Sequence, residues 1–489
     1  RRQLHTRIVP ALAKEIQEDL RKSLAGKEVS IMTDTWTSKG GRVSLNAVVV
    51  SYLDTNWDLK SVVIAATPMS GRHSALTLQN ELERVIEMYD LNVVSVTSDS
   101  ATNILKAVKD MKLSSVPCFL HQLHLIVSSS LKDWSDCHII SILKKLAHNL
   151  NLSSTKREFF FESCRQSGLP RVGIPQCVPT RWNSTYEMLN RGKEQIAAVK
   201  ETLDEYKMGK LTTNDERELA GMCNLLSPFL QYTLRLSSDS SVATEIFLVA
   251  DELDEQLNQI ISDESRGVAE VAKEMKADLE RRMEKYHKSE ILSFLRFLDP
   301  RIRSNYDDIS WDEIEKKFAE KYSSDYIAPV PLTCSNSAFP LLQAKFNKNA
   351  AQGTPLASEM NRYTQECGAQ PISLSIYPPH FWRDRMQVYP RLASLALTLF
   401  TISPSSVAAE RLFSSAGCIY KSHLRNRLSG FLAENLLLIR LVGKSGRNLS
   451  IQPARILVEE LTGAENETTG VASDDESEEE SEEPKNFNV

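Results

Sequence analysis

Three acidic side chains lie at positions where they could together hold divalent metal ions. Asp34 follows the apolar run 29–33, Asp99 follows the apolar run 93–97, and Glu410 lies much further along the chain, in the segment 405–417. Carboxylate oxygens are the ligands that Mg²⁺ prefers in proteins. Two such ions about 3.5–4 Å apart can activate a water or a 3′-hydroxyl and stabilise the leaving oxygen of a phosphodiester. These residue types therefore indicate phosphodiester chemistry, provided that the three side chains meet in space.

Each acid also has an ordinary structural interpretation. Asp34 and Asp99 come at strand ends, where aspartate commonly caps a turn or a helix. Glu410 falls within about one turn of the start of a helix that Pro404 introduces and Gly417 ends, where the helix dipole favours an ionised carboxylate. A single helical glutamate is usually solvated or ion-paired, so both interpretations stay open on the residues alone.

The elements expected to position these acids follow an informative order. Three strand-like runs come first and βα units follow, as strands 29–33, 43–53 and 57–66, a helix 76–89, a strand 93–97, a helix 101–111, a strand 116–119 and a helical stretch from 121. Three antiparallel strands followed by parallel βα units describe a ribonuclease-H-like sheet. In such a sheet the strands that precede Asp34 and Asp99 are neighbours. We therefore predict an α/β fold with a mixed sheet whose edge carries both carboxylates.

The chain divides into stretches of different composition. An amphipathic helix fills most of 1–25, and the sheet with its helices fills 26–165. Helical periodicity without strand signals predicts an all-helical insertion or second domain over 166–322. Pro, Ser, Asn and Gly predict a largely irregular linker over 323–379. Helices return over 380–445, and 446–489 is a tail that is acidic and disordered from about residue 464.

Composition places the chain among globular proteins. Of its 489 residues, 42% are hydrophobic and 25% are charged, which is ordinary for a folded protein. No apolar run approaches the ~20 residues that span a bilayer, so we expect no membrane partner. The charged start is unlike a secretory signal, and because the first residue is Arg1 rather than Met we expect a fragment of a longer protein. Eight cysteines without a CxxC pair predict free thiols in a reducing compartment and no complete zinc finger.

The net charge of −6 comes from the tail. Eight acidic residues lie between Asp474 and Glu483, so the rest of the chain carries a net charge of +2. A near-neutral body with local basic clusters is compatible with a nucleic-acid partner without requiring one.

Five short segments resemble, in the same order, the signatures of the hAT (hobo–Activator) family of DNA transposases, which includes domesticated relatives with a BED zinc finger. The segments are 33–38, 98–103, 118–121, 180–184 and 405–417. The resemblance extends over about 26–442 and is weak between 194 and 377. It implies a ribonuclease-H-like core that an all-helical insertion interrupts and that the C-terminal helices complete.

The same resemblance assigns roles to the acidic residues. It implies that Asp34, Asp99 and Glu410 are catalytic and bind Mg²⁺ or Mn²⁺, with no small-molecule cofactor. Cys118 and His121 match the family's Cys-x-x-His element, which lies beside the active site. A zinc half-site and ordinary core packing are the alternatives for this pair.

Four basic residues and a tryptophan are candidate DNA contacts. Arg181 and Trp182 offer a phosphate contact beside a stacking plane for an unpaired base. The resemblance implies that this tryptophan stabilises flanking DNA while the end is cut, and a buried tryptophan at a domain junction is the alternative. Lys421, Arg425 and Arg427 either contact phosphates or form a solvated connector.

The last apolar helix carries Leu428, Leu432, Leu436 and Ile439 on one face. The resemblance implies that this C-terminal region forms a homodimer or a larger assembly. Packing of the same face within the chain is the alternative.

Three functions follow from these interpretations. The first is metal-dependent DNA cleavage and strand transfer by a transposase. The second is a domesticated, catalytically silent nuclear protein that binds DNA, regulates transcription and dimerises. The third is a dimerisation scaffold without a DNA partner. The first two predict DNA and a second copy of the chain as partners, localisation in the nucleus, and in the family a BED zinc finger upstream.

Overall fold

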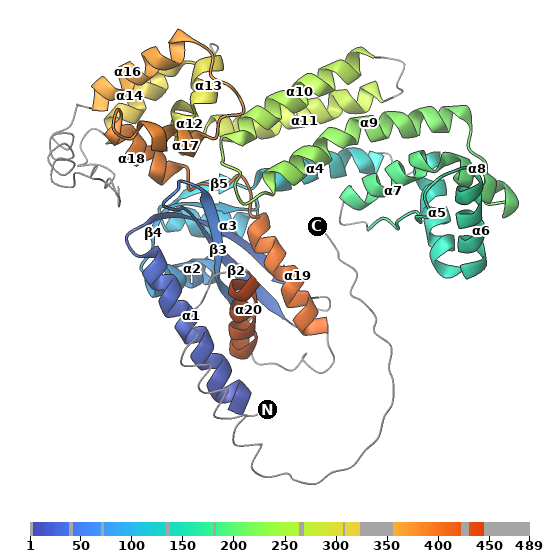
Figure 1. Cartoon of the computed structure of the whole chain (residues 1–489), viewed down its shortest axis with the longest axis horizontal. Coiled ribbons are helices and arrows are strands. Elements are labelled where there is room, and N and C mark those ends of the chain that lie inside the picture. The colour runs from blue at the N-terminus through green and yellow to red at the C-terminus, as the bar shows by residue number, and fades with distance from the viewer. Residues whose placement is uncertain are drawn as a thin grey trace, which may run out of the picture.

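Five strands form one mixed sheet (Figure 1). The structure is a computed structural model that describes residues 3–38, 43–69, 73–133, 137–178, 182–263, 268–306, 309–322, 356–421 and 430–444. The strands lie in the order β3-β2-β1-β4-β5 and are β1 (Glu28–Thr37), β2 (Ser44–Leu53), β3 (Leu59–Met69), β4 (Asn92–Ser98) and β5 (Ser114–Pro117). The β1–β2 and β2–β3 pairs are antiparallel, whereas β1–β4 and β4–β5 are parallel. The predicted order of three antiparallel strands followed by parallel βα units is confirmed.

Helices cover both faces of the sheet, which explains why its central strand is apolar throughout. Strand β2 is buried at every position of 45–53. One face packs against α1 (Val9–Leu24), α2 (Ala75–Tyr89) and α3 (Thr102–Asp110). The other face packs against α19 (Val407–Lys421) and α20 (Gly430–Lys444). Alternate strand residues serve the two clusters, with Ile31 and Val50 in the first and Met32 and Val49 in the second.

Local signals explain how the helices of the first face begin and end. The chain enters α1 through a π-helical turn (Leu4–Ile8). It leaves α1 through Gly26, whose φ of 71° suits a residue without a side chain. The Ser74 hydroxyl caps α2 by accepting a hydrogen bond from the N–H of Thr77 at 3.1 Å.

Residues 119–322, which we call the helical region, extend away from the sheet (Figure 1). Its described residues form helices joined by loops, as predicted for 166–322. The helices are α4 (Phe119–Asp133), α5 (His138–Leu152), α6 (Ser154–Gln166), α7 (Trp182–Glu194), α8 (Ile196–Glu205), α9 (Thr213–Leu236), α10 (Glu245–Ser262), α11 (Ala269–His287), α12 (Glu290–Leu298), α13 (Pro300–Asn305) and α14 (Trp311–Tyr322).

The predicted irregular linker over 323–379 is wrong beyond residue 355. Residues 323–355 lie outside the described residues, but α16 (Leu356–Ala369) follows them, and α17 (Pro378–Arg385) and α18 (Pro390–Leu399) come next. Helix α16 buries residues three or four positions apart on one face, namely Leu356, Glu359, Met360, Tyr363 and Cys367. The Pro, Ser and Gly around this short period obscured it.

A buried carboxylate joins α16 to α18. Glu359 Oε2 accepts hydrogen bonds from the N–H groups of Arg391 and Leu392, both at 3.0 Å. These N–H groups belong to the first turn of α18, which has no partners for them within the helix. The segment predicted to be a linker therefore fixes the start of α18.

The fold as a whole is mixed α/β, mostly helical, with a mixed sheet. This confirms the predicted fold class at that level. None of the helices in the described ranges has both the length and the apolar character that crossing a bilayer requires.

Candidate active site

The carboxyl ends of β1 and β4 lie side by side, and each carries one of the predicted aspartates. In the parallel pairing of these strands Met32 lies opposite Thr97. Asp34 and Asp99 each come two residues after this pair. Asp99 lies just past the end of β4, where its Oδ1 accepts a hydrogen bond from the N–H of Ala101 at 3.1 Å. The prediction that the two aspartates belong to neighbouring strands is confirmed.

Glu410 lies in the first turn of α19, and the segment 401–406 before this helix is bonded to the sheet. The hydroxyl oxygens of Thr401 and Ser30 are 2.8 Å apart and both residues are buried. The Thr97 hydroxyl donates to the carbonyl of Ser403 at 3.1 Å. These bonds fix the start of α19 over the strands that carry the aspartates.

The pKa of Asp34 reports the charges of the other two acids. Burial raises the pKa of its carboxyl to about 7, and the negative charges of Glu410 and Asp99 act in the same direction. A hydrogen bond of 2.8 Å from the N–H of Thr35 opposes this rise. Since charges act strongly only at short range, the three carboxylates share one neighbourhood. We call this place, defined by Asp34, Asp99 and Glu410, the carboxylate edge.

The donor set of the carboxylate edge suits a hard divalent cation. Three carboxylates supply only oxygen ligands, and a cation would neutralise the negative charges that raise the pKa of Asp34. As the side chains stand, the described part of the chain holds no group of three or more His, Cys, Asp or Glu arranged to ligate one metal ion. The edge therefore matches Mg²⁺ or Mn²⁺ in chemistry, and the side chains would have to rotate to close around an ion.

Cys118 and His121 lie beside the carboxylate edge. Cys118 is fully buried, its N–H donates to the carbonyl of Ser98 at 2.7 Å, and its Sγ accepts from the N–H of Ser406 at 3.4 Å. Burial raises the pKa of this thiol. Burial lowers the pKa of His121, and the charge of Asp99 partly offsets that change. Cys118 thus joins the end of β4 to the start of α19, and His121 lies near Asp99.

The connection between α9 and α10 also holds the start of α19, which sequence reasoning did not find. The N–H of Ala243 donates to the carbonyl of Ile402 at 3.1 Å. Arg411, next to Glu410, pairs with Asp239 at 2.9 Å and bonds the carbonyl of Ser237. These contacts join segments far apart in the sequence, and no local pattern announces them.

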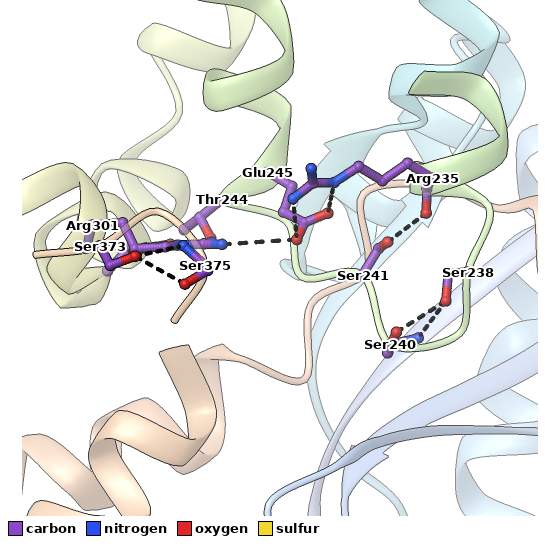
Figure 2. Close-up of polar contacts among 10 residues, drawn as sticks. Arg235, Ser238, Ser240, Ser241, Thr244, Glu245, Arg301, Ser373 and Ser375 are labelled. Atoms are coloured by element: carbon purple, nitrogen blue, oxygen red, sulfur yellow. Dashed lines mark hydrogen bonds and ion pairs between the residues drawn. The ribbon is translucent and has the colours of Figure 1, made fainter. Parts of the chain in front are cut away.

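Ion pairs give the α9–α10 connection its shape (Figure 2). Glu245 lies between two arginines, with Arg235 at 3.4 Å and Arg301 at 3.8 Å. The Ser241 hydroxyl donates to the carbonyl of Arg235 at 2.8 Å. Arg301 is buried and pairs with the buried Asp299 at 2.7 Å, so loss of either partner would leave an uncompensated buried charge.

Only one of the predicted DNA contacts can be judged from the structure. Arg181, Arg425 and Arg427 lie outside the described residues, as does the side chain of Lys421 at the end of α19. Trp182 begins α7 and is 5% exposed within the largest apolar cluster. Its ring is therefore not available to stack on a base, and the structure supports the alternative role as an anchor.

The predicted dimerisation face packs largely within the chain. Leu432 is buried, and Leu436 and Ile439 are part-buried against the clusters on the two faces of the sheet. Leu428 lies outside the described residues. On the same helix Phe431 is 64% exposed, and the sequence analysis did not single it out.

Two parts of the chain match known families. Residues 116–225 match the ZBED1 RNase-like helical domain, and residues 359–440 match the hAT family C-terminal dimerisation region. The first match begins in β5 and runs into α9, and the second runs from α16 to α20. Together they confirm the predicted resemblance to the hAT transposases.

Curated relatives extend the similarity over most of the chain. The putative transcriptional regulator tpeD of Talaromyces stipitatus is 26% identical over 93% of this chain and 59% of its own length. Human zinc finger BED domain-containing protein 4 is 23% identical over 73% of this chain and 32% of its own length. The putative AC transposase of Zea mays is 22% identical over 83% of this chain and 56% of its own length. The chain is thus related to hAT transposases and to BED zinc-finger proteins, and it spans less than two thirds of each of these relatives.

Proposed function

We propose that this chain is the catalytic body of a hAT-type DNA transposase, or of a protein derived from one. The proposed architecture is a ribonuclease-H-like core that the helical region interrupts and that α19 and α20 complete. The order of the mixed sheet and the two family matches support it. The observation that carries the proposal is the carboxylate edge, where the charges of Glu410 and Asp99 reach Asp34.

In this proposal the carboxylate edge holds Mg²⁺ or Mn²⁺. Bound there, the metal would activate a water or a 3′-hydroxyl and stabilise the leaving oxygen of a DNA phosphodiester. Asp34, with a pKa of about 7, needs nearby positive charge to be fully ionised at neutral pH. Glu410 is exposed near the positive end of α19, which favours its ionised form. Cys118 holds β4 and α19 together, so that acids from both elements face the same place.

A second candidate is a catalytically silent nuclear protein that binds DNA and regulates transcription. One observation favours it, because the relative that shares 93% of this chain is described as a putative transcriptional regulator. In that case the fold would be retained and the acids would bind no metal.

A plasmid-nicking assay separates the two candidates. We expect the wild-type chain with Mn²⁺ to nick supercoiled plasmid, and Asp99→Asn to reduce the rate about 100-fold or more, because a bound metal contributes several kcal/mol to such a step. Asp110→Asn is the matched control, since Asp110 is exposed at the far end of the helix that follows Asp99. Equal nicking by wild type and Asp99→Asn would contradict catalysis at the edge, and an inert wild type that still binds DNA would favour the regulator.

We also propose that the C-terminal region mediates self-association, supported by the family match over 359–440. Because Leu432, Leu436 and Ile439 pack within the chain, the exposed Phe431 is the better candidate for a contact between copies. Light scattering at two protein concentrations should show a dimer or larger assembly that Phe431→Ser weakens. A wild type that stays monomeric at both concentrations would remove this part of the proposal.

A further inference from the structure

Helix α11 brings two basic side chains to the carboxyl end of β4. The hydroxyl of the buried Tyr286 donates to the carbonyl of Pro117 at 3.0 Å. The ring of Tyr286 packs edge-on against Phe119, with centroids 5.5 Å apart. These contacts hold the last turns of α11 against the junction of β5 and α4. Arg282 and Lys285, which belong to the same turns, therefore have a defined place beside the sheet.

Polar side chains link α11 to the loop after β4. Arg282 Nη1 donates to Oε1 of the buried Gln122 at 3.0 Å. Gln122 Nε2 donates to the Ser100 hydroxyl oxygen at 2.9 Å, and Lys285 Nζ donates to the same oxygen at 3.4 Å. Ser100 directly follows Asp99, so these bonds connect the helical region to the carboxylate edge.

The two basic residues differ in how their charge is balanced. Arg282 pairs with Asp278 at 2.9 Å, whereas Lys285 forms no ion pair with a carboxylate among the described residues. Burial, followed by the positive charge of Arg282, lowers the pKa of Lys285 to about 8. His121, whose pKa burial lowers, is also affected by the charges of Asp99, Lys285 and Arg282. The unbalanced cation and the acid of β4 thus lie near the same histidine.

We propose that Lys285, together with Arg282 and the Ser100 hydroxyl, binds a backbone phosphate of the DNA strand that reaches the carboxylate edge. An ammonium, a guanidinium and a hydroxyl are typical donors to DNA phosphates. The Ser100 oxygen already accepts two hydrogen bonds, so its own O–H is left to donate outward. A phosphate would also neutralise the cation that no carboxylate balances. This inference rests on the proposed function, because it takes DNA as the substrate.

The salt dependence of DNA binding tests this phosphate site. The full chain is titrated with a short mixed-sequence duplex at several NaCl concentrations. Loss of one phosphate contact lowers the slope of log K against log salt by about 0.9. We expect Lys285→Gln to lower the slope by about this amount and Lys285→Arg to restore it. Lys273→Gln should keep the wild-type slope, because Lys273 pairs with Glu270 and lies roughly 18 Å away along α11.

A lysine-acetylation footprint, read by mass spectrometry with and without the duplex, locates the contact. DNA should protect Lys285 and leave Lys273 unprotected. An unchanged slope with an unprotected Lys285, in a variant that melts like the wild type, would overturn the inference even if plasmid nicking persists. A slope that depends on Lys285 in a chain that never nicks plasmid would support the phosphate site and contradict the catalytic proposal. A wild type that does not bind the duplex would overturn the phosphate site as well.

Discussion

The acids of the carboxylate edge reach it by two different means. Asp34 and Asp99 lie at the ends of adjacent parallel strands, and the backbone ladder of the sheet sets their positions. Glu410 lies on a helix whose start is held by contacts such as that between Thr401 and Ser30, and by the α9–α10 connection. The strand acids therefore depend on the sheet alone, whereas the helix acid depends on bonds between distant segments.

The two kinds of acid also differ in their surroundings. Asp34 is part-buried with a raised pKa, and Glu410 is exposed. If the comparison is right, substitutions of Asp34 and Glu410 should affect catalysis alike and stability differently. Substitutions around the start of α19 should affect catalysis through the position of Glu410.

The largest expected effect is on catalysis. Asp34→Asn and Glu410→Gln should each reduce Mn²⁺-dependent plasmid nicking about 100-fold or more, because each removes a ligand of the same metal site. The double variant should be no worse than either single variant, since residues that act as one unit are not additive. Independent, multiplying losses in the double variant would show that the two acids do not act together.

The next effect is on stability and its pH dependence. Because the pKa of Asp34 is raised from 3.8 to about 7 in the folded chain, the folded state binds a proton more tightly than the unfolded state. Stability from this group is present at low pH and is lost as pH rises through about 7. Asp34→Asn should therefore stabilise the chain by about 1–3 kcal/mol at pH 8 and by much less at pH 5. Glu410→Gln should change stability little at either pH.

Urea unfolding at the two pH values gives both numbers. A destabilised Asp34→Asn at pH 8, in a chain that remains folded, would mean that the ionised carboxylate is favourably held there. The contrast with Glu410 would then be wrong.

A smaller effect should follow from loosening the start of α19. The hydroxyl of the buried Ser51 donates to the carbonyl of Thr401 at 2.7 Å. Ser51→Ala should cost about 1–3 kcal/mol in the free energy of unfolding, and it should also slow nicking because Glu410 loses its support. The control is Ser130→Ala, because the buried Ser130 bonds only the carbonyl of Ile126 in its own helix, at 3.2 Å. Equal loss of nicking in both variants would indicate general destabilisation.

The smallest effect is expected at Arg411. Its pair with Asp239 is exposed, so Arg411→Ala should cost less than about 1 kcal/mol, and the effect should shrink at high salt. Nicking should fall less than in Ser51→Ala, as measured in the same plasmid assay. A larger loss than in Ser51→Ala would show that the α9–α10 connection, rather than the sheet, is the main support of Glu410.

The parts of the fold that the sequence predicted are those with local signals. Apolar runs of strand length, ending at Asp34 and Asp99, predicted two adjacent strands, because strand pairing in βα units follows simple rules. Glu410 could be assigned to the site only through the family resemblance, since no local rule links α19 to β1. Helix α16 was missed because its short apolar period lies among turn-forming residues.

Burial decided the residues that sequence reasoning placed wrongly or overlooked. Trp182 has the chemistry of a stacking surface, but it lies in the core. Lys285 belongs to a charged helix face that resembles any solvated face until the buried Tyr286 fixes its place beside Ser100. Such assignments require tertiary contacts, which the spacing of residues along one helix does not contain.

The central claim is that Asp34, Asp99 and Glu410 hold a divalent metal together. Its most direct test is anomalous diffraction at the manganese edge from crystals of the full chain grown with Mn²⁺. We predict an anomalous peak at the carboxylate edge within bonding distance of oxygens from all three acids, and no such peak in Asp34→Asn. A well-ordered edge that stays empty while Mn²⁺ binds elsewhere, with Glu410 turned away from the aspartates, would contradict the account.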